Sequence, residues 1–508
     1  MDSIVTDLVE VMKKETNFLA RERAMMIFFT QLIATITQLA FQTLDEEICA
    51  QCKKEGFRVD RKSERTITFL FGPVTYVRRR MKNQANDIRY PLDEFLGIRK
   101  GLRYSSLVLR NVAQLGSNMV YRHVSQAIDC LTSWQMSHQN VQQLVVKTGE
   151  FIQARSTHES RYDGVITKKK VPYLYLEGDG VKINGQKKQS LEVHRFQVCE
   201  GSQKVGNRSE MIAPHFVSHL NRQKAYKEMM AYLQAYYDLS HTVVISNSDG
   251  GSGYEKAVFD ELALGCLRHE HFRDRYHVHR KIKERMAFVP QLQHRMIRAI
   301  EHYDWQAVQL VLDTSESLIE EKEAEALEHL RLLHHYLQRS WPYLKSLKAR
   351  GIRDPKACIG TIESTHRKIT YRMKRQGRLW TTTGAQAMIR VIDSLRNQEL
   401  EGWLNQYEAL PDDVVAQEKR WHAMKRWVQK KPRFQAHEGA FKGQIGEGKA
   451  KSAPLGQFAK GLNQLIMTPN FSNKNLFLLE MMRANRTKVR LKNNFVSAPK
   501  DGFFIQPQ

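Results

Sequence analysis

Two short apolar strands, each followed by an aspartate beside a glycine, constrain the fold of this chain most. The first covers 171–176 and leads to Asp179, and the second covers 242–246 and leads to Asp249. Residues 190–199 alternate between apolar and polar side chains, which is typical of a further strand. A predicted helix separates this strand from the one before Asp249. This order of elements predicts a mixed sheet with helices on its faces.

The sheet pattern is interrupted after a further strand through 269–273. Residues 276–347 are almost entirely helical in pattern, and another helix begins near Thr361. We therefore expect the segment 285–355 to be a helical insertion within the sheet domain.

The first 60 residues have a helical pattern, with an apolar stretch over 25–41 that Thr and Gln side chains interrupt. This stretch is too short and too polar for a bilayer, so we expect a buried helix. Residues 66–77 predict a β-hairpin that runs into Arg78-Arg79-Arg80. These arginines could lie along phosphates or guard a solvated sheet edge.

Residues 104–152 predict three short helices, with Ser137 as the N-cap of the last one. That helix presents amide side chains, including Asn140 and Gln143, on its polar side. A three-helix unit of this kind fits a DNA-binding helix-turn-helix, and it fits a small helical bundle without DNA equally well.

The balance of charge indicates an anionic partner. The 508 residues contain 79 Lys and Arg against 54 Asp and Glu, a net charge of +25. Residues 414–508 contain 18 basic and 5 acidic residues, so 18 − 5 = +13 lies in this segment. This pattern is typical of nucleic-acid binding, although a solvated basic tail would look the same, and an anionic membrane is the weaker alternative. The N-terminus lacks the pattern of a signal peptide, and the six cysteines show no disulfide framework, so we expect a soluble, intracellular protein.

Three acidic residues are candidates for a metal site. Asp179 and Asp249 follow strands, at the sheet edge where ligands bind in open α/β folds, and Glu363 lies on the later helix. Carboxylates so placed can bind Mg²⁺, and three of them could form a two-metal site for phosphoryl transfer. The alternatives are ordinary Asp-Gly turns and an incidental Glu. The helix and the loop after it carry possible DNA-binding residues, namely Arg367, Arg372, Lys374, Arg375 and Trp380, of which Trp380 could instead belong to the core.

Spacing and missing motifs argue against other common sites. The histidines at 269, 271, 277 and 279 match no standard zinc pattern, and the single Cys49-x-x-Cys52 has no second pair. The sequence has neither a P-loop motif nor a Gly-x-Ser-x-Gly motif, so it supports neither ATP binding nor a common serine hydrolase.

Four blocks in order, GDGVKI, SNSDGGSGY, HFRDRYHVHRKIKE and IESTHRKITYRMKRQGRLWTTTGA, resemble the ISLre-type bacterial insertion-sequence transposases. These are relatives of the Mutator-like DDE group, and the resemblance is clear over about residues 60 to 400. It implies an RNase H-like catalytic core with Asp179, Asp249 and Glu363 as ligands of two Mg²⁺ ions, for which Mn²⁺ can substitute. It also implies that Asp274-Arg-Tyr-His277 contacts either the metal ligands or the DNA near the cut.

These inferences predict a multidomain α+β protein, in which an all-helical insertion interrupts an RNase H-like mixed α/β core. The N-terminal part is expected to consist of a helical region with a hairpin over 1–100 and a helix-turn-helix-like DNA-binding unit over 101–160. The core is expected over 165–284 and 356–410, with the insertion over 285–355 between its two parts, and a basic C-terminal region is expected over 411–508.

The expected function is that of a DNA transposase, which cleaves the ends of an insertion sequence and joins them to target DNA by metal-dependent phosphoryl transfer. Its expected partners are terminal inverted repeats, target DNA and at least a second copy of itself, and its expected location is the bacterial cytoplasm at the nucleoid. The alternatives are a catalytically silent DNA-binding protein on the same scaffold and an RNase H-like host nuclease.

Overall fold

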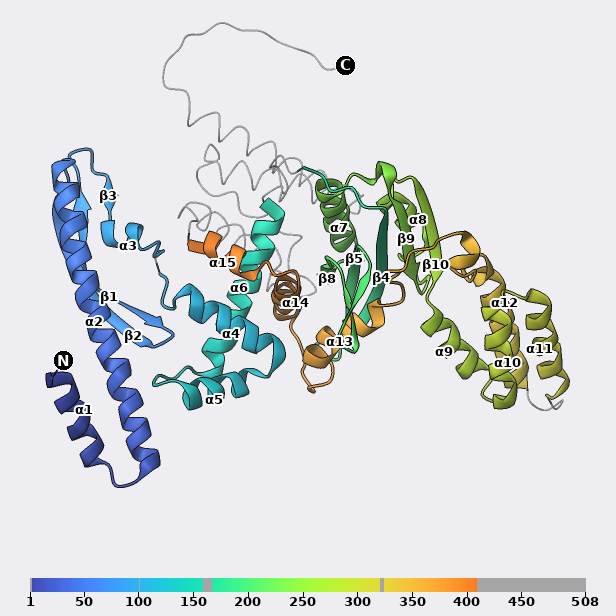
Figure 1. Cartoon of the computed structure of the whole chain (residues 1–508), viewed down its shortest axis with the longest axis horizontal. Helices are drawn as coiled ribbons and strands as arrows, with labels where there is room; N and C mark the ends of the chain where they lie inside the picture. Colours follow the sequence, from blue (N-terminus) through green and yellow to red (C-terminus); the bar gives the residue numbers. More distant parts are fainter. Residues whose placement is uncertain (1, 100, 159–166, 320–323, 409–508) are drawn as a thin grey trace, which may run out of the picture. The chain divides into compact units, whose positions relative to one another are not determined.

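The computed structural model describes residues 2–99, 101–158, 167–319 and 324–408. By its internal contacts the chain divides into two compact units, Met1–Val415 and Ala416–Gln508. All the described residues belong to the first unit, which is mixed α+β (Figure 1). The basic region predicted over 411–508 lies outside the described residues.

The N-terminal helices are α1 (Asp2–Lys14) and α2 (Phe18–Lys54). The side chain of Asn17 accepts a hydrogen bond from the backbone N–H of Ala20 at 2.9 Å, which satisfies one of the free donors at the start of α2. By length and composition, α2 is the one helix in the described part of the chain that could cross a membrane, a test that soluble core helices also pass.

The prediction of a buried helix over 25–41 is correct in the helix and wrong in the burial. No residue of the most apolar 18-residue window of α2 is buried. The neighbouring sheet contacts α2 through its C-terminal half, where Phe41, Leu44 and Ile48 are partly buried. The earlier part of α2 leaves its large apolar side chains exposed, among them Met26, Ile27, Phe29, Ile33, Ile36 and Leu39.

The predicted hairpin is confirmed and is longer than expected. Strands β1 (Arg58–Phe69) and β2 (Gly72–Lys82) are antiparallel, and β3 (Ile88–Arg89) and α3 (Pro91–Phe95) follow. Each of the three consecutive arginines has acidic partners: Arg78 with Asp93, Arg79 with Asp45 and Glu46, and Arg80 with Asp60.

The three predicted helices are present as α4 (Ser106–Asn118), α5 (Tyr121–Leu131) and α6 (His138–His158). Ser137 caps α6 as expected, because its hydroxyl accepts a hydrogen bond from the N–H of Asn140 at 3.2 Å. Helix α6 packs against α14 (Thr382–Arg396). A Cβ atom at Gly149 would lie 2.2 Å from the carbonyl oxygen of Ala387, so only glycine permits this close approach. The three helices therefore share one hydrophobic core with α14.

The central sheet has five strands in the order β10-β9-β4-β5-β8. Strands β4, β9 and β10 are parallel to one another, whereas β5 is antiparallel to both β4 and β8. Their bounds are β4 Tyr173–Asn184, β5 Ser190–Cys199, β8 His215–His219, β9 Val243–Ser248 and β10 Arg268–Arg273. The predicted strands at 171–176 and 181–183 form one continuous strand, because β5 pairs with β4 along its whole second half.

Helices cover both faces of this sheet. Helix α7 (Arg222–Tyr236) and helix α8 (Lys256–Leu262) pack on one face against Leu174, Leu176 and Phe196. Helix α13 (Ile362–Met373) lies along β4. The short hairpin of β6 (Ser202–Val205) and β7 (Arg208–Met211) follows β5, and α15 (Leu400–Glu408) follows α14.

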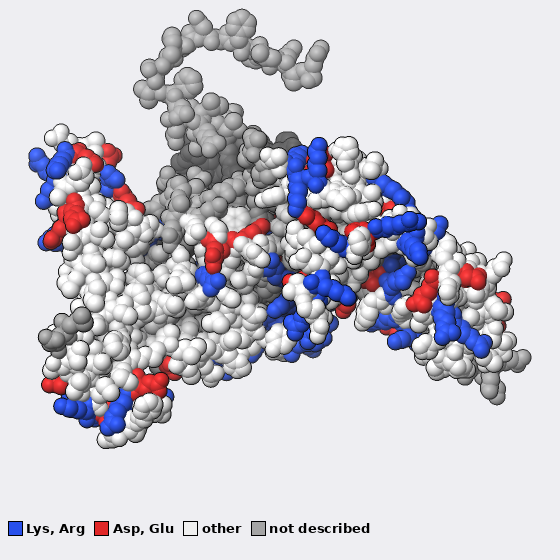
Figure 2. Space-filling model, viewed as in Figure 1, with Lys and Arg blue, Asp and Glu red and all other residues white. Residues whose placement is uncertain are grey.

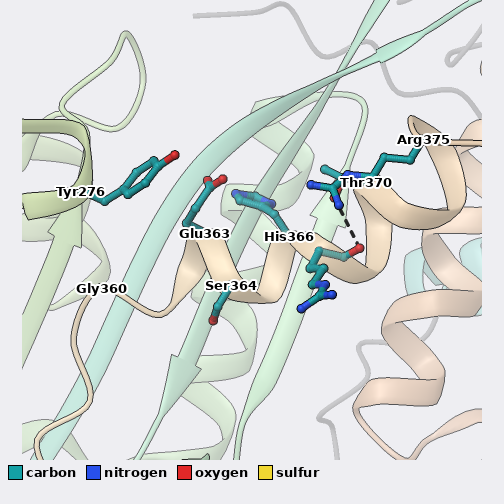
Figure 3. Close-up of a pocket in the computed structure, with 8 residues that line it drawn as sticks. Tyr276, Gly360, Glu363, Ser364, His366, Thr370 and Arg375 are labelled. Carbon is teal, nitrogen blue, oxygen red and sulfur yellow. Dashed lines mark hydrogen bonds between the residues drawn. The ribbon is translucent and has the colours of Figure 1, made fainter. Parts of the chain in front are cut away.

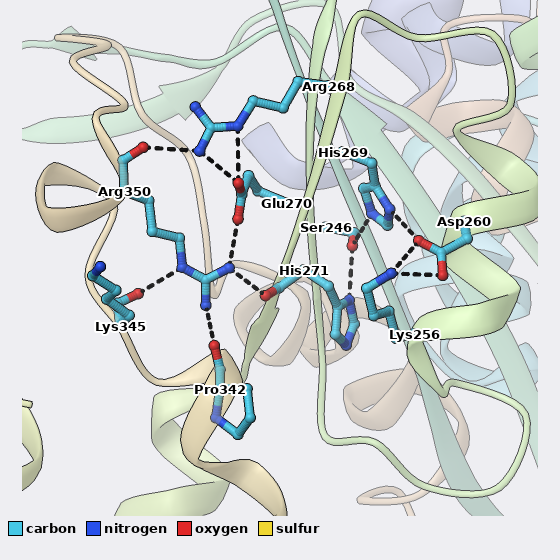
Figure 4. Close-up of polar contacts among 10 residues, drawn as sticks. All are labelled: Ser246, Lys256, Asp260, Arg268, His269, Glu270, His271, Pro342, Lys345 and Arg350. Carbon is cyan, nitrogen blue, oxygen red and sulfur yellow. Dashed lines mark hydrogen bonds and ion pairs between the residues drawn. The ribbon is translucent and has the colours of Figure 1, made fainter. Parts of the chain in front are cut away.

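The predicted helical insertion is present between β10 and α13, and it has a hydrophobic core of its own. It consists of the helices α9 Arg275–Arg285, α10 Pro290–Glu301, α11 Trp305–Ser317 and α12 Ala324–Ser340, with the short turns η2 Trp341–Tyr343 and η3 Lys348–Arg350. Arg350 joins the C-terminal end of the insertion to the sheet. The guanidinium of Arg350 contacts the carboxylate of Glu270 at 2.6 Å and the carbonyl oxygen of His271 at 3.1 Å (Figure 4).

Candidate metal centre

The parallel pairing of three neighbouring strands ends at one level of the sheet, and an aspartate is the next residue on each of them. Gly178 of β4 pairs with Ser248 of β9, which pairs in turn with Arg273 of β10. The next residues are Asp179, Asp249 and Asp274, so the parallel register places all three at the same edge. This is the edge at which open α/β sheets bind ligands.

Two of the three predicted ligands, together with a histidine, form a compact group. One side-chain oxygen of Asp179, one of Glu363 and a ring nitrogen of His277 all lie within 4.8 Å of one another. Asp179 is buried, His277 is half-buried and Glu363 is exposed. These atoms could hold one divalent cation. Asp249 lies at the same sheet edge but is not a member of this group.

The local contacts of Asp249 explain why it lies outside the group of Asp179, His277 and Glu363. Its carboxylate accepts a hydrogen bond from the N–H of Gly251 at 2.8 Å, which closes a tight turn. Gly250 adopts a positive φ of 71°, and a Cβ atom there would overlap the guanidinium of Arg273. Arg273 therefore lies against the Asp249 turn, a contact for which the sequence contains no signal.

His366 of α13 contacts the carboxylate of Asp179 and orients it. The sequence places His366 one turn after Glu363, and in the structure its Nε2 contacts Oδ2 of Asp179 at 3.1 Å. Both side chains are almost fully buried. The other carboxylate oxygen of Asp179 accepts the N–H of Gly180 at 2.7 Å, so the orientation of the carboxylate is fixed.

The Asp274-x-x-His277 motif forms the N-terminus of α9. The carboxylate of Asp274 accepts the N–H of Tyr276 at 2.8 Å and so caps α9, and His277 lies in the first turn of that helix. Burial raises the pKa of Asp274, and the charges of Asp179 and Glu363 contribute to the increase. In the described part of the chain, the buried Nε2 of His277 has no hydrogen-bond partner, so this atom is available to a ligand.

A second acid in β4, Glu177, holds the helix that carries Glu363. The Glu177 side chain is fully buried and accepts hydrogen bonds from the N–H groups of Gly360 and Thr361, the latter at 3.0 Å. Gln197 of β5 donates to Glu177 at 2.8 Å and also accepts the hydroxyl of Thr365 at 2.5 Å. Burial raises the pKa of Glu177 to about 7. The available signal was its position two residues before Asp179, which places both side chains on one face of the strand.

Two arginines, the buried Arg195 and the half-buried Arg396, hold the next turn of α13. Arg195 and Arg396 each donate to the carbonyl of Thr365 at 3.0 Å, and their guanidinium groups lie over the ring of Phe216. Burial lowers the pKa of Arg195 to about 10 and that of Arg396 to about 9. Helix α13 is thus fixed to the sheet by polar contacts on both sides of Glu363.

A cleft of about 450 Å³ opens beside Glu363 (Figure 3). Tyr276 forms one wall, and Glu363 and His366 of α13 face it across the opening. Arg367 and Arg375 lie farther along the cleft. An acidic centre therefore opens into a cleft with cationic side chains, an arrangement that suits a phosphate-containing ligand.

The structure corrects two of the predicted DNA contacts. Arg372 is 1% exposed, donates to the carbonyl of Gly116 at 2.7 Å and lies between the rings of Tyr121 and Trp380. Trp380 is buried too, and its indole N–H donates to the carbonyl of Met373 at 3.0 Å. Neither side chain can reach a phosphate or a base, because the inner face of α13 packs against α4 and the core.

The other predicted DNA contacts are exposed. Arg367, Lys374 and Arg375 lie on the outer side of α13 and the loop after it. Asn140 and Gln143 are exposed on α6 and line a separate cleft of about 440 Å³ with Arg103 and Lys147. Exposure is compatible with DNA contact, which remains a prediction for all five predicted contacts.

Two comparisons relate the chain to known proteins. Residues 15–402 match a family model described as "Uncharacterised protein family (UPF0236)". A protein of Streptococcus gallolyticus, named "UPF0236 protein in vanSb 3'region", is 34% identical over 399 residues. The alignment covers 78% of this chain and 86% of that protein. The family match includes the sheet, the helical insertion and α13.

Proposed function

This chain belongs to the UPF0236 family, and we propose that it is a DNA transposase that cleaves the ends of a mobile element and joins them to target DNA. The observation that carries the proposal is the group of Asp179, Glu363 and His277, of which Glu363 also lines a cleft with cationic side chains. Asp179 comes from β4, at the point where its pairing with β9 ends, and Glu363 comes from a helix that follows a helical insertion, as the resemblance to DDE transposases implies.

The sheet supports the same proposal. In the order β10-β9-β4-β5-β8, the first three strands are parallel, β5 is antiparallel to them, and β8 is antiparallel to β5 and so runs in the same direction as β4. This arrangement is the one expected of an RNase H-like core. In this arrangement Asp179 of β4, Asp249 after β9 and Glu363 of α13 would act at one edge of the parallel strands. Asp249 is at that edge, where it would be available to a second cation.

The side chains of the group fit a divalent cation. Carboxylate oxygens suit Mg²⁺ and Mn²⁺, and the ring nitrogen of His277 suits Mn²⁺ better than Mg²⁺. The Nε2 of His277 is buried and has no hydrogen-bond partner among the described residues, which supports a role as a ligand. A bound cation would supply charge stabilisation for in-line phosphoryl transfer and would activate the attacking oxygen.

The residues around the group would have separate tasks. Asp179 and Glu363 would hold the cation, while His366 and Glu177 keep Asp179 and α13 in place. Arg367 and Arg375 would bind phosphates of the DNA that enters the cleft. Because two element ends must be joined, at least two copies of the chain would act together.

The proposal is tested by DNA cleavage and joining. The full chain is incubated with a duplex that carries the DNA flanking its gene, in the presence of Mg²⁺ or Mn²⁺. We expect nicking at the element end and joining to a second duplex, both reduced to the level of a metal-free reaction by Glu363→Gln or Asp179→Asn. Glu328→Gln is the matched control, because Glu328 is an exposed acid on α12 paired with Arg331.

Each other outcome favours a different protein class. Equal cleavage by the wild type and Glu363→Gln would contradict the assigned acid. DNA binding without cleavage by either protein would favour a silent DNA-binding protein on this scaffold. Metal-dependent cleavage with no preference for element ends would favour a nuclease that acts on a host substrate.

A further inference from the structure

The hairpin between β4 and β5 extends the candidate site along α13. Three contacts show that β4 and α13 run side by side: Glu177 with Thr361, Asp179 with His366, and Gly185 with Trp380. At about 3.3 Å per residue, β4 runs about 17 Å from Asp179 to its end at Asn184. Lys187 and Lys188, at the tip of the hairpin, follow Asn184 and therefore lie beyond the end of this stretch of strand.

The turn at this tip has an unusual composition. Lys187 and Lys188 both have φ values of 58°, and the N–H of Gln189 donates to the carbonyl of Gln186 at 3.2 Å. Two consecutive positive φ values at the centre of a four-residue turn define the type I′ geometry, which strongly favours Asn and Gly. Lysine is disfavoured at both positions. Residues that break a local rule of this kind are expected at functional sites.

The tip is held rigidly against the loop that follows α13. The N–H of Gln186 donates to the carbonyl of Trp380 at 3.0 Å, and the N–H of Trp380 donates to the carbonyl of Asn184 at 3.0 Å. Since Trp380 is buried, it anchors the hairpin instead of contacting a ligand. This contact brings the two lysines close to the cations of the α13 loop.

Five exposed cations gather here. Within the ranges that the structure describes, none of them forms an ion pair: Lys187, Lys188, Lys374, Arg375 and Arg378. Figure 2 shows Lys and Arg side chains gathered around α13 and its loop. Arg375 also lines the cleft beside Glu363, so the cationic surface is continuous with the candidate site.

We propose that Lys187 and Lys188 form a nucleic-acid backbone contact, the far end of a binding surface that begins at the acidic centre. The inference rests on the proposed function, since it assumes that the ligand of the centre is DNA. Each strand of duplex DNA has one phosphate per about 3.4 Å of helix axis, so about 17 Å corresponds to about five nucleotides. The two lysines would therefore hold the strand at least about five nucleotides from the reacting phosphate.

The test replaces the charges by the residues that the turn prefers. Lys187→Asn together with Lys188→Gly removes both cations and supplies type I′ chemistry, so we expect the thermal midpoint to stay equal or to rise. Binding of a labelled duplex is measured over a series of salt concentrations. We expect a loss of affinity of about tenfold or more at low salt, and a decrease of about 1.8 in the slope of log K against log salt.

Two control variants complete the test. Lys187→Arg with Lys188→Arg keeps the charges and should bind as the wild type does. Lys204→Gln with Arg208→Gln removes two exposed cations beside the turn of the neighbouring β6–β7 hairpin, and it should leave binding unchanged. Unchanged affinity and salt slope in Lys187→Asn/Lys188→Gly would overturn the inference.

The two proposals fail separately. A reduced salt slope in that variant, with no DNA cleavage by the wild type, would support the hairpin contact and contradict the transposase. DNA cleavage by the wild type, with an unchanged salt slope in the variant, would support the transposase and contradict the hairpin contact. Absence of any DNA binding by the wild type would contradict both.

Discussion

Two basic runs look alike in the sequence and differ completely in the structure. In the first, Arg78-Arg79-Arg80, every guanidinium is paired with an acid of the same N-terminal region. In the second, Arg372-Met-Lys374-Arg375, one arginine is buried and the other two cations are exposed and lack ion pairs among the described residues. The density of positive charge in a sequence therefore does not show which cations are available to a ligand.

The strongest test of the first run removes its buried acid. Asp93 is 5% exposed and contacts Arg65, Arg78 and the hydroxyl of Tyr76. Asp93→Asn leaves two half-buried or buried arginines without a counter-charge, so we expect a loss of about 3–5 kcal/mol in the free energy of unfolding. Chemical denaturation measures it. Asp60→Asn, which breaks the more exposed pair with Arg80, should cost less than about 1 kcal/mol. Similar losses in both variants would contradict the distinction between them.

The second run can be divided by a pair of substitutions. Arg372→Ala removes a side chain that packs between two aromatic rings and leaves the carbonyl of Gly116 unpaired, so we expect a loss of about 2–4 kcal/mol. Arg375→Ala should change stability by less than about 0.5 kcal/mol, because Arg375 is exposed. Thermal and denaturant unfolding measure both. A stable Arg372→Ala protein with weakened DNA binding would show that Arg372 is a ligand contact after all.

A third kind of base is kept neutral inside the sheet. His271 is 2% exposed and its Nδ1 contacts the hydroxyl of Ser246 at 2.8 Å (Figure 4). Burial lowers its pKa to about 3. In the unfolded chain His271 takes up a proton as pH falls through about 6.5, whereas in the folded protein it stays neutral until the pH is near 3. The contribution of neutral His271 to the free energy of unfolding is therefore fully present above pH 6.5 and is lost as pH falls from 6.5 towards 3.

The measurement compares two proteins at two pH values. From pH 7 to pH 5 we expect the wild type to lose about 2 kcal/mol more stability in urea than His271→Asn, which retains a polar atom for Ser246. Equal losses in the two proteins would show that His271 is protonated without cost in the fold.

Local elements were predictable because local patterns specify them. The strands before Asp179 and Asp249, the hairpin after 66 and the cap at Ser137 all follow from alternation, turn residues and side-chain hydrogen bonds near in sequence. The helix that carries Glu363 was likewise expected to begin near Thr361, and it begins at Ile362.

The candidate site was predictable in its acids and not in their grouping. Spacing identified Asp179 and Glu363, but it could not show that His277 joins them while Asp249 turns towards Gly251. The role of Glu177 was missed because the role of an acid inside an apolar strand cannot be inferred until its hydrogen-bond partners are known. Those partners, Gly360 and Thr361, are more than 180 residues away in the chain.

The sequence by itself determined the order of the strands and helices, the placement of acids after strands and the excess of positive charge. Only the tertiary structure decided which charged side chains meet: Arg372 turns inward, Arg375 faces the cleft and the apolar face of α2 stays exposed. The physical reason is the range of the interactions. Backbone preferences and caps act over a few residues, whereas burial and ion pairing depend on neighbours that the fold brings from distant parts of the chain.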